Sequence, residues 1–490
     1  MLKVNVNKML KVKKFLNLLI IPFIYGFLDT KKLLEIEKNI DCYSRVLLEI
    51  NENYEEKINN NKLFIDTALY ILSQLDKESY VYSSEKIFEE KEIGIELENI
   101  DEKFYVIKIK KDLKNVNEHL HVGGEILSIN NEKISEELIN SLDQNSETFE
   151  LGFRSDEKGE IKKLKFKKKK KNKGLIFHKK IREDSLFLKI EEFKTGISEE
   201  VKEKIYNNIE NLKNIIFDLR ENGGGLIGEC LDILKLFIPI DKEILKTVNK
   251  KKEILQVYKT DQEKQIENIK IFVIVDKKTA SAAEIFAGIV QDLNLGVVLG
   301  EKTYGKGTFQ VIKSISDDIK IKITNGFYLL PRGKLLQKGS EIQPDILIEK
   351  KKEPEIILEL KKKLAFNRFI CEIFSEKNNN KKIIDDNLIL KFCNWSIKNL
   401  EIYSNNKVFF SLKSIIQKFE KNDQINNNII QMQQLINKII QKEMLKYKKE
   451  IKKKLEIAID EYLYPYETLF EKNINNDPYI ICINKILEKR

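Results

Sequence analysis

The spacing of hydrophobic and polar positions changes along this chain and predicts several kinds of structure in succession. Between residues 31 and 85, apolar residues recur at three- and four-residue spacings, which indicates helices. From Glu89 to about Lys170 they form short alternating runs typical of β-strands, at residues 93–97, 104–109 and 126–129. A helical stretch at 136–142 and two further strands complete this β-rich segment.

Residues 175–350 show a third pattern, in which buried strands alternate with helices. The expected strands are 185–190, 214–219, 271–275 and 296–299, and the expected helices lie near 198–211, 227–236 and 282–293. This alternation predicts an α/β domain with parallel strands. Loops at the carboxyl ends of those strands are then the places where binding or catalytic side chains are expected.

Beyond Pro354 the chain contains no glycine, and its pattern predicts helices. One apolar stripe has spacings of 4, 3, 4 and 3, and a second stripe continues beside it. The first consists of Ile425, Ile429, Met432, Ile436 and Ile439, and the second of Ile440, Met444, Tyr447 and Ile451. Such stripes bury against another surface. Two interpretations remain open: packing onto this chain's own helices, and a homo-oligomer formed through them.

The N-terminus combines basic residues with a short apolar run. Five lysines within residues 3–14 precede the mostly apolar residues 15–28. As a helix, this run would rise only about 21 Å, short of the roughly 30 Å hydrocarbon core of a membrane. The pattern is typical of a secretory signal, so we expect export to the periplasm or cell envelope. An uncleaved membrane anchor and a buried N-terminal helix remain alternatives.

Composition limits the partners and cofactors that need to be considered. The chain has 490 residues, 42% of them hydrophobic, which is enough for several folded units. The net charge of +10 arises from 87 basic and 77 acidic residues, in a chain rich in Lys, Ile and Asn throughout. This residue usage is better explained by the base composition of the genome than by selection for binding a nucleic acid. The five cysteines are widely separated and form no C-x-x-C motif, so neither a zinc site nor a disulfide framework is predicted.

A local basic run spans Lys163 to Lys173. It could form a patch for a polyanion such as a nucleic acid. Its first half alternates like a strand, and its second half falls where a linker is expected. We therefore interpret it as a solvated edge strand followed by a linker.

The first segment that could take part in binding or catalysis is the run from Ile215 to Gly225, where a buried strand leads into three glycines. Glycine lets the backbone turn sharply and lets a ligand approach bare N–H groups. Such amides can stabilise the negative charge of a tetrahedral intermediate. A glycine triplet alone is more simply explained as a tight strand-to-helix turn.

The second segment is Thr279-Ala-Ser-Ala-Ala-Glu-Ile285, which places Ser281 between a strand and a helix. The Ala282 amide lies next to it in the chain and could act as a hydrogen-bond donor to a substrate. A serine at this position is also a common helix N-cap. Glu284 and Asp292 are nearby polar residues for which a structural role is at least as reasonable.

The third segment, Gly300 to Gln310, carries a lysine between two glycines at Gly305-Lys306-Gly307. A serine hydroxyl is a poor nucleophile until a base removes its proton, and a lysine in a dry, crowded pocket can be that base because burial favours its neutral form. Lys302 competes for this role but lacks flanking glycines. The three histidines (His119, His121 and His178) all lie well upstream, so a Ser-His-Asp triad would have to take one from another region.

Taken together, the three segments resemble the C-terminal processing, or tail-specific, serine proteases. The motif D-L-R-x-N-x-G-G corresponds to residues 218–225, S-A-S-A-S-E-I to residues 279–285, and G-E-x-T-x-G-K-G-x-x-Q to residues 300–310. The interval of 25 residues between the nucleophilic serine and the lysine is kept. Further similarities lie at residues 75–80, 124–130, 328–334 and 342–345. Three features depart from the family: Ala283 replaces a serine, Gly223 replaces a common proline, and the region after about residue 355 has no counterpart.

The resemblance implies roles for particular residues. Ser281 would be the nucleophile, Lys306 the general base, and Gln310 the residue that orients the lysine amine. The oxyanion would be held by backbone amides of Ala282 and of the glycine loop, Gly224 and Gly225. Residues 89–170 would form a PDZ domain whose amides at Ile93, Gly94 and Ile95 receive the carboxylate of an extended chain end. No metal, nucleotide or other cofactor is implied.

The resemblance also implies an architecture and a class of substrates. We expect an α/β protease core with crotonase- or ClpP-like layers at residues 173–352, an inserted PDZ-like β domain at 87–172 and helical regions at 29–86 and 353–490, after a signal or anchor at 1–28. The expected substrates are proteins or peptides with exposed C-termini. The alternative from another class is a non-catalytic scaffold that keeps the PDZ-like domain and a protease-like core.

Overall fold

The computed structural model describes most of the chain after residue 29. The described residues are 30–55, 58–76, 78–83, 95–109, 120–135, 138–139, 148–154, 160–167, 176–316, 319–337, 339–348, 353–375, 384–400, 426–464 and 466–489. The predicted signal or anchor at 1–28 lies outside them. Among the described helices, none has both the length and the apolar character needed to cross a membrane. The chain divides into two compact units, Met1–Lys86 with Ile312–Ile323, and Ile87–Val311 with Thr324–Arg490.

The first unit contains two helices and a short strand. Helix α2 spans Thr30–Asn53 and α3 spans Asn60–Ser73. The Asn59 side chain caps α3 by accepting a hydrogen bond from the Lys62 N–H. Strand β1 (Tyr80–Ser83) pairs antiparallel with residues 319–322 of β16 (Ile319–Leu329). The predicted helices are confirmed, whereas the strand was not expected from the sequence.

A six-stranded sheet forms the centre of the second unit, in the order β17-β14-β13-β10-β9-β8. The strands are β17 (Ile346–Leu347), β14 (Gly296–Gly300), β13 (Lys270–Val275), β10 (Asn214–Asp218), β9 (Ser185–Lys189) and β8 (Phe177–Arg182). All pair in parallel except β8, which runs antiparallel to β9. The predicted alternation of parallel strands and helices is confirmed, and β8 and β17 are additional edge strands.

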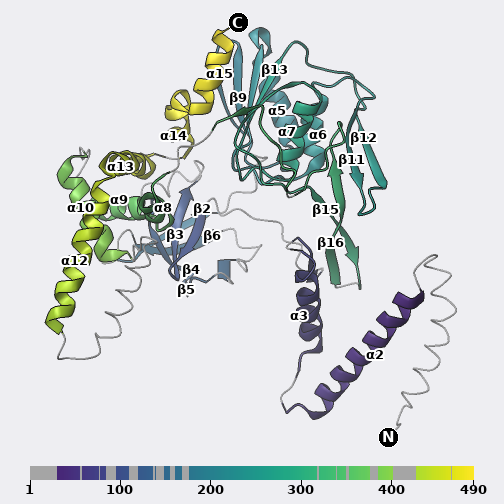
Figure 1. The fold of residues 1–490 in the computed structure, drawn as a ribbon, viewed down its shortest axis with the longest axis horizontal. Coiled ribbons are helices and arrows are strands. Elements are labelled where there is room, and N and C mark those ends of the chain that lie inside the picture. The colour runs from purple at the N-terminus through teal and green to yellow at the C-terminus, as the bar shows by residue number, and fades with distance from the viewer. Residues whose placement is uncertain are drawn as a thin grey trace. The chain divides into compact units, whose positions relative to one another are not determined.

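Both faces of this sheet are covered, because successive side chains of a strand point to opposite sides. In β10, Ile215 and Phe217 join one core, whereas Ile216 joins the other. The first core is shared with α5 (Ile197–Tyr206), α6 (Ile227–Lys235) and α7 (Ala282–Asp292). Residues from the end of the chain, in η3 (Ile474–Asn476) and α15 (Pro478–Glu488), close the second core, with α14 (Tyr466–Asn473) packed against it. Figure 1 shows α15 beside β9, with α5 and α7 on the other side of the sheet.

Two smaller sheets belong to the same unit. Strands β2 (Ile95–Ile100), β3 (Lys103–Ile109), β4 (Glu125–Ile129), β6 (Thr148–Arg154) and β7 (Lys162–Lys167) form an antiparallel sheet in that order, and β5 (Glu132–Lys133) pairs with β4. Their side chains enclose a separate core around Val106, Ile126 and Phe153. Elsewhere, β11 (Glu243–Val248) pairs with β12 (Ile254–Lys259) and with residues 327–329 of β16.

The expected β runs and the basic edge strand are recovered in the β2–β7 sheet. Strand β7 lies at the edge of this sheet, as predicted for the start of the basic run. The predicted helix at 136–142 and the linker after residue 167 fall largely outside the described residues. The Lys163 and Lys165 side chains pair with Glu150 on the neighbouring strand, at 3.2 and 3.5 Å. Part of the basic run is therefore neutralised within its own sheet.

The predicted C-terminal helices are confirmed as α8 (Glu355–Lys362), α9 (Ala365–Ser375), α10 (Asp386–Asn399), α12 (Asn426–Leu445) and α13 (Lys448–Leu463). They enclose a core of their own. Residues of the second stripe, such as Met444 and Ile451, are buried in this core, and Ile440 packs against it. This part of the pattern therefore packs onto the chain's own helices. On the first stripe, Ile439 is 43% exposed, and oligomerisation through it stays a prediction.

Candidate active site

The Ser281 segment joins β13 to α7, and its backbone is strained. Ser281 occupies the N-cap position of α7 with φ 56° and ψ −122°. An ordinary N-cap residue has an extended backbone, and a non-glycine residue with positive φ is uncommon in proteins. Such strain at a strand-to-helix turn is typical of a nucleophilic serine whose hydroxyl must be presented to a substrate. The simple N-cap interpretation therefore does not account for this geometry.

Glu284 links the Ser281 segment to the turn that carries Lys306. This side chain is fully buried. Its Oε2 atom accepts hydrogen bonds from the Ser281 N–H at 3.0 Å and from the Lys306 N–H at 2.8 Å. The two backbone nitrogens therefore lie closer together than the sum of these distances. The single carboxylate oxygen thus brings the predicted nucleophile and base, 25 residues apart in the sequence, to one place.

The second oxygen of Glu284 holds the rest of the lysine turn. Its Oε1 atom accepts from the Thr303 hydroxyl at 2.5 Å and from the Gly305 N–H at 2.7 Å. Thr303 in turn accepts a hydrogen bond from the Ile342 N–H at 2.9 Å. Glu284 therefore receives four hydrogen bonds and acts as the buried anchor of the turn.

Glycine is required beside Lys306 because other backbone lies against the turn. A Cβ atom at Gly307 would come within 1.8 Å of the Leu336 carbonyl oxygen. The turn lies between β14 and β15 (Thr308–Ser314). Lys302, the competing base, is 51% exposed, and its Nζ atom pairs with Glu341 at 2.9 Å. These contacts favour Lys306 over Lys302 as the base.

Gln310 lies on β15, within the same region. Its amide nitrogen donates to the hydroxyls of Thr308 at 3.3 Å and Thr324 at 3.5 Å. These bonds fix the side-chain amide between two strands. That Gln310 orients the amine of Lys306 stays a prediction.

The glycine loop after β10 packs directly against the serine. Gly224 has φ 113°, and a Cβ atom there would lie 2.7 Å from the Ser281 Cβ. The Gly224 N–H donates to Asn222 Oδ1 at 2.8 Å, so this amide is already occupied. Among the described residues, the N–H groups of Ala282 and Gly225 have no hydrogen-bond acceptor. Of the three predicted oxyanion donors, these two amides are therefore the ones open to a ligand.

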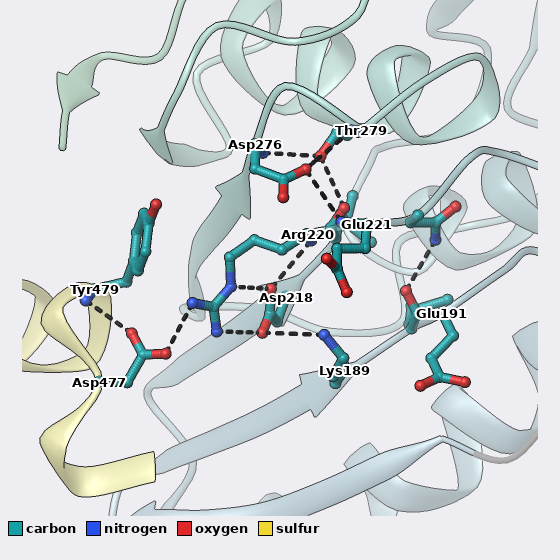
Figure 2. Close-up of polar contacts among 12 residues, drawn as sticks. Lys189, Glu191, Asp218, Arg220, Glu221, Asp276, Thr279, Asp477 and Tyr479 are labelled. Carbon is teal, nitrogen blue, oxygen red and sulfur yellow. Dashed lines mark hydrogen bonds and ion pairs between the residues drawn. The ribbon is translucent and has the colours of Figure 1, made fainter. Parts of the chain in front are cut away.

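Asn222 fixes the glycine loop between two neighbouring segments. Its side-chain nitrogen donates to the Ile190 carbonyl at 2.9 Å, and its own carbonyl accepts from the Ala280 N–H at 2.9 Å. Asp276 adds a further connection, because its Oδ1 atom accepts from the N–H groups of Glu221 and Thr279, both at 3.1 Å. Figure 2 shows Asp276 and Thr279 above the loop. The roles of Asn222 and Asp276 were not deduced from the sequence.

The start of the loop contains a buried cluster of charges (Figure 2). Asp218, which is fully buried, bonds the Arg220 guanidinium through Nη2 at 2.6 Å and Nε at 2.8 Å, and lies 3.8 Å from Lys189 Nζ. Burial alone would raise the pKa of Asp218, but the attraction of Lys189 and Arg220 outweighs burial and holds that pKa below its usual value. The carboxylate is therefore charged at neutral pH.

Replacing Asp218 with asparagine is expected to destabilise the protein by about 3–5 kcal/mol, because Lys189 and Arg220 would lose the buried carboxylate that they share and Arg220 would keep only its pair with Asp477. In the wild type, the folded-state pKa lies below the unfolded-state value of about 3.9. The stabilising contribution is therefore complete above that value and is lost as the pH falls through the folded-state pKa. Urea unfolding at pH 7 and pH 3 measures both effects. A variant as stable as the wild type at pH 7 would contradict this account of the cluster.

The remaining candidate residues lie away from this site or outside the described residues. Asp292 is at the opposite end of α7 from Ser281 and accepts from the Arg332 N–H at 2.9 Å, a structural role. His178 is exposed on the edge strand β8, and His121 bonds the Tyr462 carbonyl through Nδ1. Ile93, Gly94 and His119 are outside the described residues, and Ile95 begins β2.

Comparison with known proteins shows which family the domain around this site resembles. Residues 184–348 match the model of peptidase family S41. This part of the chain is thus similar to the peptidases of family S41, and the predicted relationship to the C-terminal processing serine proteases is confirmed. Among the described residues, no group of three or more His, Cys, Asp or Glu side chains that could hold a metal ion comes together.

Individual relatives extend the similarity beyond this domain. The protein named "Probable CtpA-like serine protease" from Staphylococcus aureus (strain MRSA252) is 26% identical over 327 residues, which is 64% of this chain and 65% of the relative. Its namesake from Staphylococcus epidermidis (strain ATCC 35984) is 34% identical over 163 residues, 33% of each chain. A solved photosystem II D1 C-terminal processing protease is 16% identical, with a TM-score of 0.42 over 68% of this chain and 91% of its own. This chain thus spans about two thirds or less of the length of these curated relatives.

Proposed function

We propose that this chain is a serine endopeptidase in which Ser281 is the nucleophile and Lys306 the general base. The observation that carries the proposal is the pair of hydrogen bonds from the Ser281 and Lys306 amides to one oxygen of buried Glu284. The strained backbone of Ser281 adds a second argument, because it presents the hydroxyl at the start of α7. Gly224 packs against Ser281, and the amide of the next residue, Gly225, has no acceptor among the described residues.

In the proposed reaction, the neutral amine of Lys306 takes the hydroxyl proton of Ser281, and the oxygen of Ser281 attacks a peptide carbonyl carbon. The amides of Ala282 and Gly225 stabilise the oxyanion that results. Lys306 then returns its proton to the leaving amine, and the peptide bond breaks to leave an acyl-enzyme on Ser281. Water, activated by the same amine, hydrolyses this ester and restores the free serine.

The β2–β7 sheet is proposed to be the PDZ-like reader of substrate tails. Strand β2 lies at the edge of this sheet, and most of its residues are at least partly exposed. An extended peptide can add to such an edge as a further strand. Ile95 begins β2, where the resemblance places the receptor for a terminal carboxylate.

Cleavage of a synthetic peptide with a free C-terminal carboxylate tests the function, and the same peptide with an amidated end tests tail recognition. We expect fragments detectable by mass spectrometry, unaffected by EDTA and abolished by a serine-directed phosphonate. Amidation should raise KM about tenfold and leave kcat nearly unchanged, because it removes a charge bound away from the cleaved bond. Equal KM values for the free and the amidated peptide would contradict the proposed carboxylate receptor. The absence of cleavage of any peptide would contradict the proposed activity.

The same observations count against two alternative functions. A non-catalytic scaffold would have no use for the strained Ser281 or for its link to the lysine turn. A nucleic-acid binder based on residues 163–173 would need basic side chains that Glu150 partly neutralises. Export to the cell envelope, with residues 15–28 as a cleaved signal or an anchor, remains part of the proposal and is settled by mass spectrometry of the mature N-terminus.

A further inference from the structure

The C-terminal segment reaches the predicted active site through one aspartate. Asp477 lies at the N-cap of α15, where its Oδ1 atom accepts from the Tyr479 N–H at 2.8 Å. Its other oxygen, Oδ2, accepts from Arg220 Nη1 at 2.8 Å. Figure 2 shows Asp477 between the start of the helix and the guanidinium. One side chain therefore caps α15 and also pairs with the loop that follows β10.

This ion pair completes a buried balance of charge. The cluster contains two cations, Lys189 and Arg220, and two anions, Asp218 and Asp477, none of which is more than 16% exposed at its side chain. Without Asp477, Arg220 would keep only one of the two carboxylates that it bonds. The Tyr479 ring lies 4.7 Å from the Arg220 guanidinium, which limits the access of water to the cation.

Arg220 stands at the start of the loop that ends against Ser281. Glu221, the next residue, has φ 65°, so the chain turns sharply at this point. Asn222 follows and holds the Gly224 amide at 2.8 Å, and Gly224 packs against the Ser281 side chain. Arg220 is therefore five residues before Gly225, whose amide is proposed to hold the oxyanion, and the loop between them is fixed by these contacts.

We infer that Asp477 is a positioning residue for peptide hydrolysis: through Arg220 it fixes the glycine loop beside Ser281. This inference rests on the proposed function of that site. It gives the C-terminal segment, which lies outside the residues matching the peptidase family, a part in the reaction. Catalysis by this chain then depends on residues nearly 200 positions beyond the serine.

Asp477→Asn separates the two roles of the side chain. Asparagine is as good an N-cap as aspartate, so α15 keeps its start, but it carries no charge to balance Arg220. We expect kcat to fall about 10- to 100-fold, because small displacements of catalytic groups have effects of this size, with KM within about twofold of the wild type. The matched control is Tyr479→Phe, which keeps the ring and removes a hydroxyl that has no hydrogen-bond partner among the described residues; its kcat should equal that of the wild type.

Hydrogen–deuterium exchange provides a readout that does not depend on activity. In Asp477→Asn, the hydrogen-bonded amides of Asn222 and Gly224 should exchange faster than in the wild type, while those of α15 should not change. If exchange rose only in the loop but the wild type cleaved no peptide, the structural link from Asp477 through Arg220 to the loop would be supported. The proposed peptidase activity would then be contradicted. A wild-type kcat with unchanged loop exchange would overturn the inference, and so would exchange that rises equally in the loop and in α15.

Discussion

Replacing either Ser281 or Lys306 with alanine is expected to lower kcat/KM for a susceptible peptide by at least about 10⁴-fold. The first change removes the atom that becomes acylated, and the second removes the base that takes its proton. Since the two act as one unit, the double variant should be no less active than either single variant. Steady-state cleavage of one fluorogenic peptide by all three proteins measures this.

Lys302→Ala is the matched control for the lysine. It removes an amine four residues away in the same turn, but that amine pairs with Glu341 in a half-exposed position. An exposed ion pair of this kind contributes roughly 0–1 kcal/mol, so activity should stay close to that of the wild type. If Lys302→Ala lost activity while Lys306→Ala kept it, the base would be Lys302 and the assignment to Lys306 would be wrong.

The second large effect is expected from Glu284→Gln, which lowers kcat about 10²- to 10³-fold. Both oxygens of Glu284 accept two hydrogen bonds, and all four come from N–H or O–H donors. A glutamine would turn an NH₂ group toward two of these donors. Hydrogen bonds to a charged group are worth roughly 1.5–3 kcal/mol each, so the Ser281 and Lys306 segments should separate, and misplaced groups react slowly.

The control for this prediction lies at the other end of the same helix. Asp292 is also a carboxylate that accepts a backbone N–H, from Arg332, but it does not touch the serine or the lysine turn. Asp292→Asn should therefore leave kcat nearly unchanged, and circular dichroism should show both variants folded. A fully active Glu284→Gln protein would show that the dyad does not depend on this anchor.

The elements around the site could be predicted because their apolar positions follow the geometry of the fold. Strands such as 271–275 are buried on both faces and therefore form continuous apolar runs, and α7 begins directly after Ser281 as expected. Strands β11 and β12 were not anticipated. Residues 254–259 of β12 are mostly exposed, so burial imposes little pattern on them.

The residues that organise the site were harder to deduce. Ser281 and Glu284 have the S-x-x-E spacing of a capping box, and the bond from the Ser281 N–H to Glu284 is the return bond of that motif. This signal could have identified Glu284 as the anchor, although not its bonds to the lysine turn. The contact between Arg220 and Asp477 joins positions 257 residues apart. No local pattern encodes such a contact, because it depends on how the C-terminal segment packs over the sheet.

Covalent labelling of the wild type and Lys306→Ala with a fluorophosphonate, followed by peptide mass spectrometry, shows whether Ser281 is a nucleophile activated by Lys306. We expect the reagent to add to Ser281 in the wild type and to react at least about 10²-fold more slowly in Lys306→Ala, because general-base assistance is typically worth about 10²–10⁴-fold. Equal labelling rates in the two proteins, or a protein that cleaves peptides while Ser281 stays unlabelled, would contradict this expectation.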